Sequence, residues 1–267
     1  MGFQFDDAIA VIARGTDQYS AEVQLGWDIG GNANGGYALA LVGAAMRDAA
    51  DHREPITATA HYLSPLRAGP VEIDTQVVKR GKRLTTVLAT VRQGDRDALR
   101  TIGAFGEFPD PTEGLFHSAG APPTLPNFED CPPRNSGSQQ FPVAFMDYVD
   151  VRIHPEDSGF ARGLASGNAL VRGWFAFPDH RPIDALAMLL ATDAFPPALF
   201  NLTGAPGWVP TIELTAHIRA EPAPGPLRGV FASRFIQGGM FEEDGELWDS
   251  QGILVCQSRQ LGLMPRL

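Results

Sequence analysis

Two stretches of twelve residues decide the expected fold: TAHYLSPLRAGP at residues 59–70 and TAHIRAEPAPGP at residues 215–226. Both begin with Thr-Ala-His and end with Gly-Pro. One three-letter match is weak evidence, but two matches in the same register indicate a duplicated unit of roughly 110 residues. The chain is therefore expected to contain two similar halves.

The order of secondary-structure signals is the same on both sides of the chain. Each half has an apolar run typical of a helix, followed by alternating, β-branched or aromatic segments that favour strands. In the first half we expect a short strand at 23–25, a helix at 35–50, and strands near 56–63, 70–79, 84–92 and 98–108. In the second half we expect a strand near 168–177, a helix near 182–200, and strands near 211–219, 226–236, 239–248 and 252–264.

A proline-rich segment separates the halves. Eight prolines stand between Glu107 and Pro142 among Gly, Ser and Asn, and the segment has neither a helical nor a strand period. Such composition is typical of a connector. We therefore expect an N-terminal unit at 1–108, a connector at 109–142 and a C-terminal unit at 143–267.

The helix-then-strands order limits the architecture. A helix followed by an antiparallel meander can bury itself and the concave face of the sheet only if the sheet wraps round the helix. That arrangement is the hotdog, and two hotdogs pair so that their sheets become continuous. The sequence thus predicts an α+β fold, a double hotdog with two helix-wrapped antiparallel sheets in one chain.

Several stretches resemble the double-hotdog acyl-CoA thioesterases, the group that includes bacterial acyl-CoA thioesterase II. They are NGGYALALVGAAM at 34–46, HYLSPLRAGPVEIDTQVVKRGKRLTTVLATVRQGD at 61–95, WVPTIELTAHIRAEPAPGPL at 208–227 and LWDSQGILVCQSRQLGLM at 247–264. The resemblance covers nearly the whole chain except the connector. It implies hydrolysis of acyl-CoA thioesters to free acid and CoA, with no metal and no bound cofactor, because CoA enters as part of the substrate.

The stretch GNANGGYALA at 31–40 places glycines and asparagines directly before the first predicted helix. It lacks the Gly-Lys-Ser/Thr ending of a phosphate-binding P-loop and does not match GxGxxG in a βαβ setting. Gly35 and Gly36 would let a substrate approach the N–H groups of the first helical turn, where the helix dipole favours negative charge. We expect the N–H groups of Gly36 and Tyr37 to polarise a substrate carbonyl, with Asn34 and Gly35 at the substrate. The alternative is that Asn34 only caps the helix.

Asp193 is the candidate catalytic base. Single-unit hotdog thioesterases often carry Gly-Gly at a helix start and an acid eight residues after the first glycine. Eight residues after Gly35 stands Gly43, whereas eight residues after Ala185 stands Asp193. The halves look complementary, so we expect one composite site, with backbone donors from the first helix and the acid from the second. The alternative is an exposed carboxylate, or one bonded to a backbone N–H near Pro196.

The resemblance implies two partners for this base. The thioesterase II pattern has a Thr or Ser at the start of the next strand and a Gln on the last strand, and Thr211 and Gln260 match those positions. With Asp193 as base, they would fix the attacking water by hydrogen bonds. The family's Asp-His after the Thr is replaced by Glu213-Leu214 here, which leaves the surrounding polar network in doubt.

Other polar residues are weaker candidates. Arg80, Lys82 and Arg83 lie in a predicted hairpin turn, where they could bind CoA phosphates or simply be solvated. His61 and His217 occupy matching positions in the two halves, which favours a repeated structural role over catalysis.

The acyl chain requires an apolar pocket. Phe195 and Trp208 are the aromatic residues that we expect to line it, with Trp174 and Met188 as further candidates. Each of the four could equally belong to the core.

Composition excludes several classes of protein. The net charge of -10 and pI of about 5.0 argue against binding to nucleic acid, which needs clustered Lys and Arg. The two cysteines, at 131 and 256, have no Cys or His at metal-ligand spacing, so neither a zinc site nor a disulfide framework is expected. The N-terminus carries acids where a signal peptide carries positive charge, and no run of about 18 apolar residues occurs. We expect a cytoplasmic protein with no membrane partner.

Two other activities suit the same fold. An enoyl-CoA hydratase normally uses a paired Asp and His in one short motif, which neither predicted helix provides, and a non-catalytic acyl-CoA-binding protein would leave Asp193 idle. A serine hydrolase is disfavoured because no GxSxG occurs. The joined units already satisfy the pairing that single hotdogs achieve by dimerising. A monomer is therefore one expectation, and a homo-oligomer formed through sheet or helix contacts is the other.

Overall fold

The computed structural model describes residues 2–110, 114–134, 143–204 and 207–264. Its helices are α1 Gln4–Ala8, α2 Gly35–Ala49, α3 Ala185–Ala191 and α4 Phe200–Thr203, with the 3-10 turns η1 Phe128–Asp130, η2 Ala144–Asp147, η3 Pro155–Asp157 and η4 Gly159–Arg162. Its strands are β1 Val11–Gly15, β2 Gln18–Val23, β3 Asp28–Ile29, β4 Asn32–Ala33, β5 Glu54–Tyr62, β6 Gly69–Arg80, β7 Leu84–Gln93, β8 Arg96–Gly106, β9 Asp150–Ile153, β10 Leu170–Ala176, β11 Thr211–Ile218, β12 Leu227–Ala232, β13 Ile236–Gln237, β14 Met240–Trp248 and β15 Leu254–Leu263.

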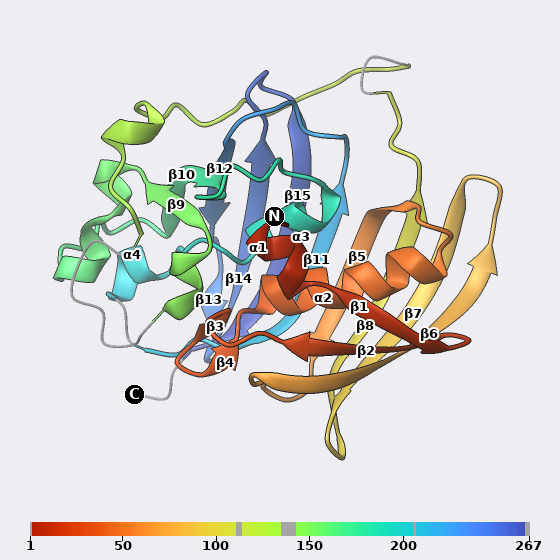
Figure 1. Ribbon diagram of the computed structural model, residues 1–267. Helices are drawn as coiled ribbons and strands as arrows, with labels where there is room; N and C mark the ends of the chain where they lie inside the picture. Colours follow the sequence, from red (N-terminus) through yellow and green to blue (C-terminus); the bar gives the residue numbers. More distant parts are fainter. Residues whose placement is uncertain (1, 111–113, 135–142, 205–206, 265–267) are drawn as a thin grey trace.

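One antiparallel sheet of 13 strands runs through both halves (Figure 1). Its order is β1-β2-β6-β7-β8-β5-β11-β15-β14-β12-β10-β9, with β13 paired to β14, and β3 and β4 form a separate two-stranded ribbon. The order reads the same outward from the β5–β11 junction, because β8, β7 and β6 on one side correspond to β15, β14 and β12 on the other. The α+β class and the antiparallel strands agree with the sequence-based prediction.

The repeated Thr-Ala-His stretches meet at this junction. Strands β5 and β11 are antiparallel neighbours in which Thr59 lies opposite Thr215. The two hydroxyl oxygens are 2.9 Å apart and share a hydrogen bond. The repeat therefore marks the seam at which the two halves join into one sheet.

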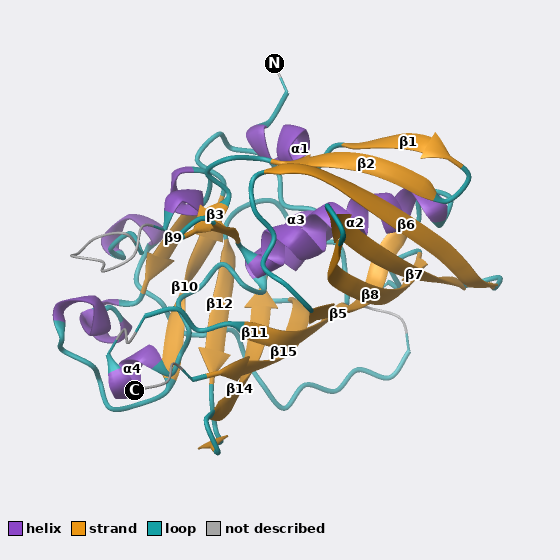
Figure 2. Ribbon diagram, turned by 90° about the horizontal axis from the view of Figure 1, so that it is seen from below, coloured by secondary structure: helices purple, strands orange, loops and turns teal. Residues whose placement is uncertain are grey.

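Helix α2 fills the concave side of the first half. Asn34 caps it, and its side chains are buried along most of its length, including Leu39, Leu41 and Met46. Figure 2 shows the strands of the first half curving round α2, with α3 beside it. Burying each such side chain contributes about 2 kcal/mol, so the helix is held mainly by the sheet.

The second helix is shorter than predicted. The expected helix at 182–200 is α3 Ala185–Ala191, followed after a turn by α4 Phe200–Thr203. Asp184 starts α3 by accepting a hydrogen bond from the N–H of Ala187 at 2.8 Å. Beyond α3, Pro196 and Pro197 have no N–H to donate and cannot continue a helix, which corrects the prediction.

Other boundaries differ by a few residues. The strand expected at 23–25 is β2 Gln18–Val23, and the strand expected near 226–236 is divided between β12 and β13. Parts of the predicted connector, residues 111–113 and 135–142, lie outside the described residues. In the described part of the chain, none of the helices has the length and apolar character needed to span a bilayer.

Candidate active site

A cavity of about 820 Å³ opens at the junction of the two halves. Its lining includes Asn34 and Tyr62 from the first half, and Asp193, Thr211 and Gln260 from the second. The helix tip and the acid predicted to converge therefore face one cavity. The loop that follows α3 and the start of β11 also line the cavity.

Asp193 is bound by the N-terminal end of α2. Its Oδ2 accepts hydrogen bonds from Nδ2 of Asn34 at 3.0 Å and from the backbone N–H of Gly36 at 3.1 Å. Nδ2 of Asn34 also donates to the backbone carbonyl of Asp193 at 2.8 Å. These contacts join residues 157 to 159 positions apart in the sequence, so the acid position depends on the association of the halves.

The expectation that the N–H groups of Gly36 and Tyr37 face a substrate carbonyl needs correction for Tyr37. The N–H of Tyr37 donates to Oδ1 of Asn34 at 2.9 Å, which is a helix cap, and the N–H of Gly36 donates to Asp193. Both donors expected to face a substrate carbonyl thus have protein acceptors, because a cap and a buried carboxylate compete for the same groups. Asn34 both caps α2 and donates a hydrogen bond to the carboxylate of Asp193.

The glycines of α2 permit close contact with α3. A Cβ on Gly36 would lie 2.4 Å from the carbonyl oxygen of Leu190, and one on Gly35 would lie 2.9 Å from Oδ2 of Asp193. A Cβ on Gly43 would lie 3.0 Å from Cδ1 of Leu189. Gly43 is the residue eight positions after Gly35, where the sequence pattern would have placed an acid. It is therefore a contact point between the two helices.

Burial raises the pKa of Asp193 to about 6. The N–H of Gly36, the positive charge of Arg134 and the amide of Asn34 act in the opposite direction. The carboxyl group is consequently ionised above about pH 6, and is a stronger base there than an ordinary aspartate.

Thr211 and Gln260 belong to a hydrogen-bond chain that ends at a buried glutamate. The hydroxyl of Thr211 donates to Oε1 of Gln260 at 3.0 Å, and Nε2 of Gln260 donates to Oε1 of Glu243 at 2.9 Å. The N–H of Ala198 donates to Oε2 of Glu243 at 2.5 Å. The sequence did not identify Glu243 as a site residue, because it stands in a predicted strand with no motif around it.

Two further residues at the cavity were also missed. Tyr62 donates from its hydroxyl to the carbonyl of Gly35 at 2.8 Å, and burial raises its pKa well above the ordinary range. Arg134 donates from Nη1 to the carbonyl of Ala194 at 2.5 Å, and burial lowers its pKa to about 10 while Asp193 opposes that effect. Arg134 comes from the proline-rich connector, whose lack of period gave no signal for it.

The apolar part of the cavity has aromatic walls. Phe195 and Trp208, both predicted, line it. Trp174 and Met188 do not: Nε1 of Trp174 donates to the carbonyl of Pro126, and Met188 is fully buried in the core.

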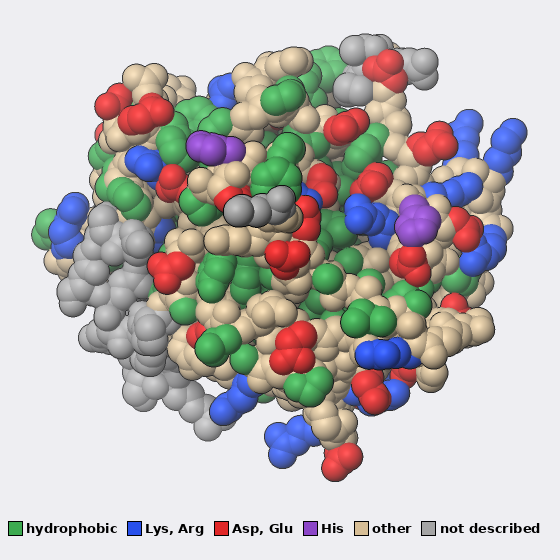
Figure 3. Space-filling view, viewed as in Figure 1, with side chains coloured by type: hydrophobic (Ala, Val, Ile, Leu, Met, Phe, Trp, Pro, Cys, Tyr) green, Lys and Arg blue, Asp and Glu red, His purple; other side chains and the backbone are tan. Residues whose placement is uncertain are grey.

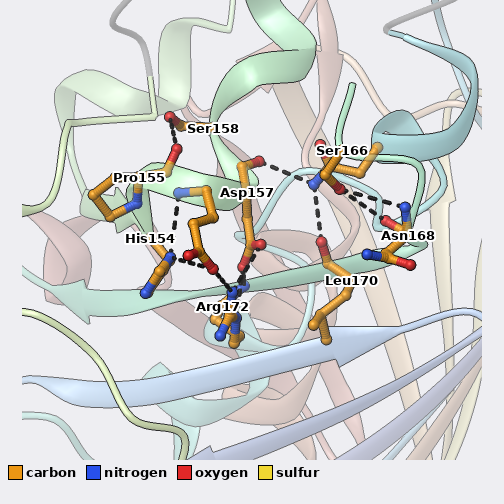
Figure 4. Close-up of polar contacts among 10 residues, drawn as sticks. His154, Pro155, Asp157, Ser158, Ser166, Asn168, Leu170 and Arg172 are labelled. Carbon is orange, nitrogen blue, oxygen red and sulfur yellow. Dashed lines mark hydrogen bonds and ion pairs between the residues drawn. The ribbon is translucent and has the colours of Figure 1, made fainter. Parts of the chain in front are cut away.

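A polar network connects Asp157 and Arg172 with neighbouring segments (Figure 4). Oδ2 of Asp157 accepts hydrogen bonds from the backbone N–H and from Nε of Arg172 at 3.0 and 2.8 Å. Asn201 donates from Nδ2 to the carbonyl of Asp157 at 2.9 Å. The network ties η3 and α4 to β10, and the neighbouring Phe160 and Phe200 line the cavity.

The predicted basic hairpin lies elsewhere. Arg80 pairs with Asp51 and donates to the carbonyl of Ala49 at the C-terminal end of α2, whereas the cavity lies at the other end of this helix. Neither Arg80 nor the neighbouring Lys82 and Arg83 belongs to the cavity lining. Basic side chains gather at the right of Figure 3, where Figure 1 shows the β6–β7 turn.

The histidines are also away from the cavity. His61 and His217 are exposed on β5 and β11 and do not line it, and their expected structural role stays a prediction.

Two family models match the chain. The acyl-CoA thioesterase N-terminal domain matches residues 23–106, and the acyl-CoA thioesterase C-terminal domain matches residues 128–264. Together they include Asn34, Asp193, Thr211 and Gln260.

Three similar proteins extend the comparison. A Mycobacterium tuberculosis protein of uncharacterised function is 30% identical over 92% of this chain and 91% of its own. A Thermobifida fusca structure provisionally called a thioesterase II is 33% identical, with a TM-score of 0.88 over 99% of this chain and 98% of its own. A hot dog fold protein of unknown function from Alicyclobacillus acidocaldarius is 23% identical over 100% of both chains, with a TM-score of 0.86, and shows the fold alone.

Proposed function

Because this chain belongs to the acyl-CoA thioesterase family, we propose that it hydrolyses acyl-CoA thioesters to the free acid and CoA with water activated by Asp193. One observation carries the assignment. The Asp193 carboxylate, bound by the tip of α2, shares a cavity with Thr211 and Gln260. We also interpret the chain as two hotdog units, 1–108 and 143–267, that share this composite site.

The reaction has two covalent steps. Asp193 takes a proton from a water molecule as the water oxygen forms a bond to the thioester carbonyl carbon. The tetrahedral intermediate then collapses, the C–S bond breaks, and the proton passes from Asp193 to the departing thiolate. A carboxylate whose pKa is about 6 suits both steps, because it is ionised at neutral pH and still accepts a proton readily.

Thr211 and Gln260 orient the water. With its own proton donated to Gln260, the Thr211 hydroxyl oxygen offers lone pairs to the cavity. A water molecule that donates one proton to Asp193 and the other to this oxygen has a lone pair left for the carbonyl carbon. Fixing the water in this way converts a bimolecular attack into an intramolecular one.

The donors that hold Asp193 also serve the developing oxyanion. A protonated carboxyl group accepts weaker hydrogen bonds than a carboxylate. As Asp193 takes up the proton, the N–H of Gly36 and the amide of Asn34 become available to the carbonyl oxygen. Tyr37 acts only through the Asn34 cap. Phe195 and Trp208 contact the acyl chain.

The test is release of free thiol from a series of acyl-CoAs by the parent protein and by Asp193→Asn. Loss of a general base predicts a decrease in kcat of about 10²–10⁴-fold without loss of the fold. Asp95→Asn, in the exposed turn between β7 and β8, is the matched control and should behave like the parent. Unchanged hydrolysis by Asp193→Asn would refute the role of Asp193, and binding of acyl-CoA by the parent without thiol release would refute the activity.

A further inference from the structure

Glu243 is a buried carboxylate for which the proposed reaction has no covalent role. Its side chain on β14 is part of a residue only 4% exposed, and both of its oxygens have donors. Burying a carboxylate costs free energy even when it is hydrogen-bonded. An apolar side chain would fill the same place at a lower cost in folding free energy. The presence of a glutamate at this position therefore needs an explanation.

The reason lies in the amide of Gln260. The oxygen and nitrogen ends of a glutamine amide are nearly equal in size, so shape alone does not decide which end faces which neighbour. Oε1 of Glu243 can only accept a hydrogen bond when ionised, and it therefore binds the nitrogen end of Gln260. The oxygen end is then left for the hydroxyl of Thr211.

We propose that Glu243 is a positioning residue that sets the direction of the Glu243–Gln260–Thr211 hydrogen-bond chain, so that acceptors and no donor face the attacking water. The inference rests on the proposed hydrolysis at this site. With the amide of Gln260 reversed, its nitrogen would donate to Thr211, and the freed hydroxyl proton would bind the lone pair that the water needs for attack.

The same carboxylate also holds the loop that carries the base. Oε2 of Glu243 accepts from the N–H of Ala198, five residues after Asp193, while Nη1 of Arg134 donates to the carbonyl of Ala194. Glu243 therefore connects the Asp193 loop to β14 and to Gln260 on β15. A change at Glu243 reaches both the base and the water-binding side chains.

The ionisation of Glu243 supports this role above about pH 7. Burial, and less strongly the negative charges of Asp193 and Glu242, raise the pKa of Glu243 to about 7, while the N–H of Ala198 and the amide of Gln260 act in the opposite direction. The positive charge of Arg134 lies close enough to interact with it. Below pH 7 the protonated group becomes a donor, which removes its preference for the nitrogen end of Gln260, and the activity should fall.

The main test is Glu243→Gln. The backbone N–H of Ala198 requires an acceptor, so the new amide must keep its oxygen there and turn its nitrogen to Gln260. Gln260 must then reverse. We expect kcat to fall about 10–100-fold, with KM within about twofold of the parent, because one misdirected hydrogen bond at the reacting water has that effect.

The exchanged pair Glu243→Gln/Gln260→Glu provides a rescue. The carboxylate at position 260 accepts from the amide at position 243 with one oxygen and from the hydroxyl of Thr211 with the other, so the original direction returns with the same net charge. We expect the kcat of this double variant to be at least about tenfold higher than that of Glu243→Gln. Glu246→Gln is the matched control, because Glu246 lies on the same strand but on its other face, where it accepts from Nε1 of Trp248.

The outcomes separate this inference from the function on which it rests. Parent-like kcat in Glu243→Gln, or no recovery in the exchanged pair, would overturn the positioning role even if Asp193→Asn is inactive. Full hydrolysis by Asp193→Asn would refute the proposed base alone. The ¹⁵N–¹H signals of the Gln260 side-chain amide give a readout without turnover: they should shift in Glu243→Gln, and unchanged signals would contradict the inference.

Discussion

Replacing Asp193 by Asn should make the protein more stable at pH 8 while it removes the catalytic base. Burial raises the pKa of the Asp193 carboxyl group to about 6, from an ordinary value of 3.8. The charged form is therefore disfavoured in the folded protein relative to the unfolded chain. An asparagine has similar size and carries no charge.

The magnitude follows from the pKa difference. About two pKa units correspond to about 3 kcal/mol, which is the upper limit because the carboxylate opens onto the cavity and water screens its charge. We expect the variant to gain about 1–3 kcal/mol at pH 8. For a chain of this size, that raises Tm by about 2–6 °C.

The stability difference between Asp193→Asn and the parent should depend on pH. Because the folded pKa is raised, the contribution of Asp193 to stability is complete below about pH 4 and is lost as the pH rises through about 6. The gain in Tm of Asp193→Asn should therefore be largest at pH 8 and vanish near pH 4.

Scanning calorimetry from pH 4 to pH 8.5 measures this difference, with Asp95→Asn as the control that should show no such trend. A variant Tm below that of the parent at pH 8 would refute the conclusion that burial disfavours the charged form of Asp193. A Tm difference that is equal at pH 4 and pH 8 would refute it as well.

Three further substitutions have definite expected outcomes. Gly36→Ala should lower stability by about 1–3 kcal/mol or more in thermal unfolding, because the new Cβ would lie 2.4 Å from the carbonyl oxygen of Leu190; unchanged Tm would show that α2 and α3 can separate freely. Tyr62→Phe should cost about 1 kcal/mol, since it leaves the carbonyl of Gly35 without its donor, and an equal or higher Tm would argue against that bond. Lys82→Ala should leave KM for acyl-CoA within about twofold of the parent, and a tenfold increase would restore the hairpin as a CoA site.

The repeat predicted two similar halves, whereas the pairing of its two copies at the junction was found only in the structure. Thr-Ala-His recurs in one register, and a sheet that pairs two copies of a unit places equal positions opposite each other, as Thr59 and Thr215 are. The end of the second helix was missed because its apolar run continues past Ala191, and that run was given more weight than Pro196 and Pro197, which cannot continue a helix.

The site could be predicted in part. Gly35-Gly36 and Asp193 were expected to converge, and they do. Which acceptor the N–H of Gly36 would bind could not be read from the letters, because a substrate carbonyl and a carboxylate suit it equally. Glu243 escaped prediction for a different reason: its contact with Gln260 depends on the register of β14 against β15, which sequence periodicity does not determine.

The glycine pair and the acid form a single device for setting basicity. Burial alone would raise the pKa of Asp193 above about 6. The N–H of Gly36 and the amide of Asn34 lower it again, and they can do so only because Gly35 and Gly36 allow the tip of α2 to approach the carboxylate. A base in one half is thus adjusted by donors in the other, which gives a chemical reason why two units that each lack one part form one site together.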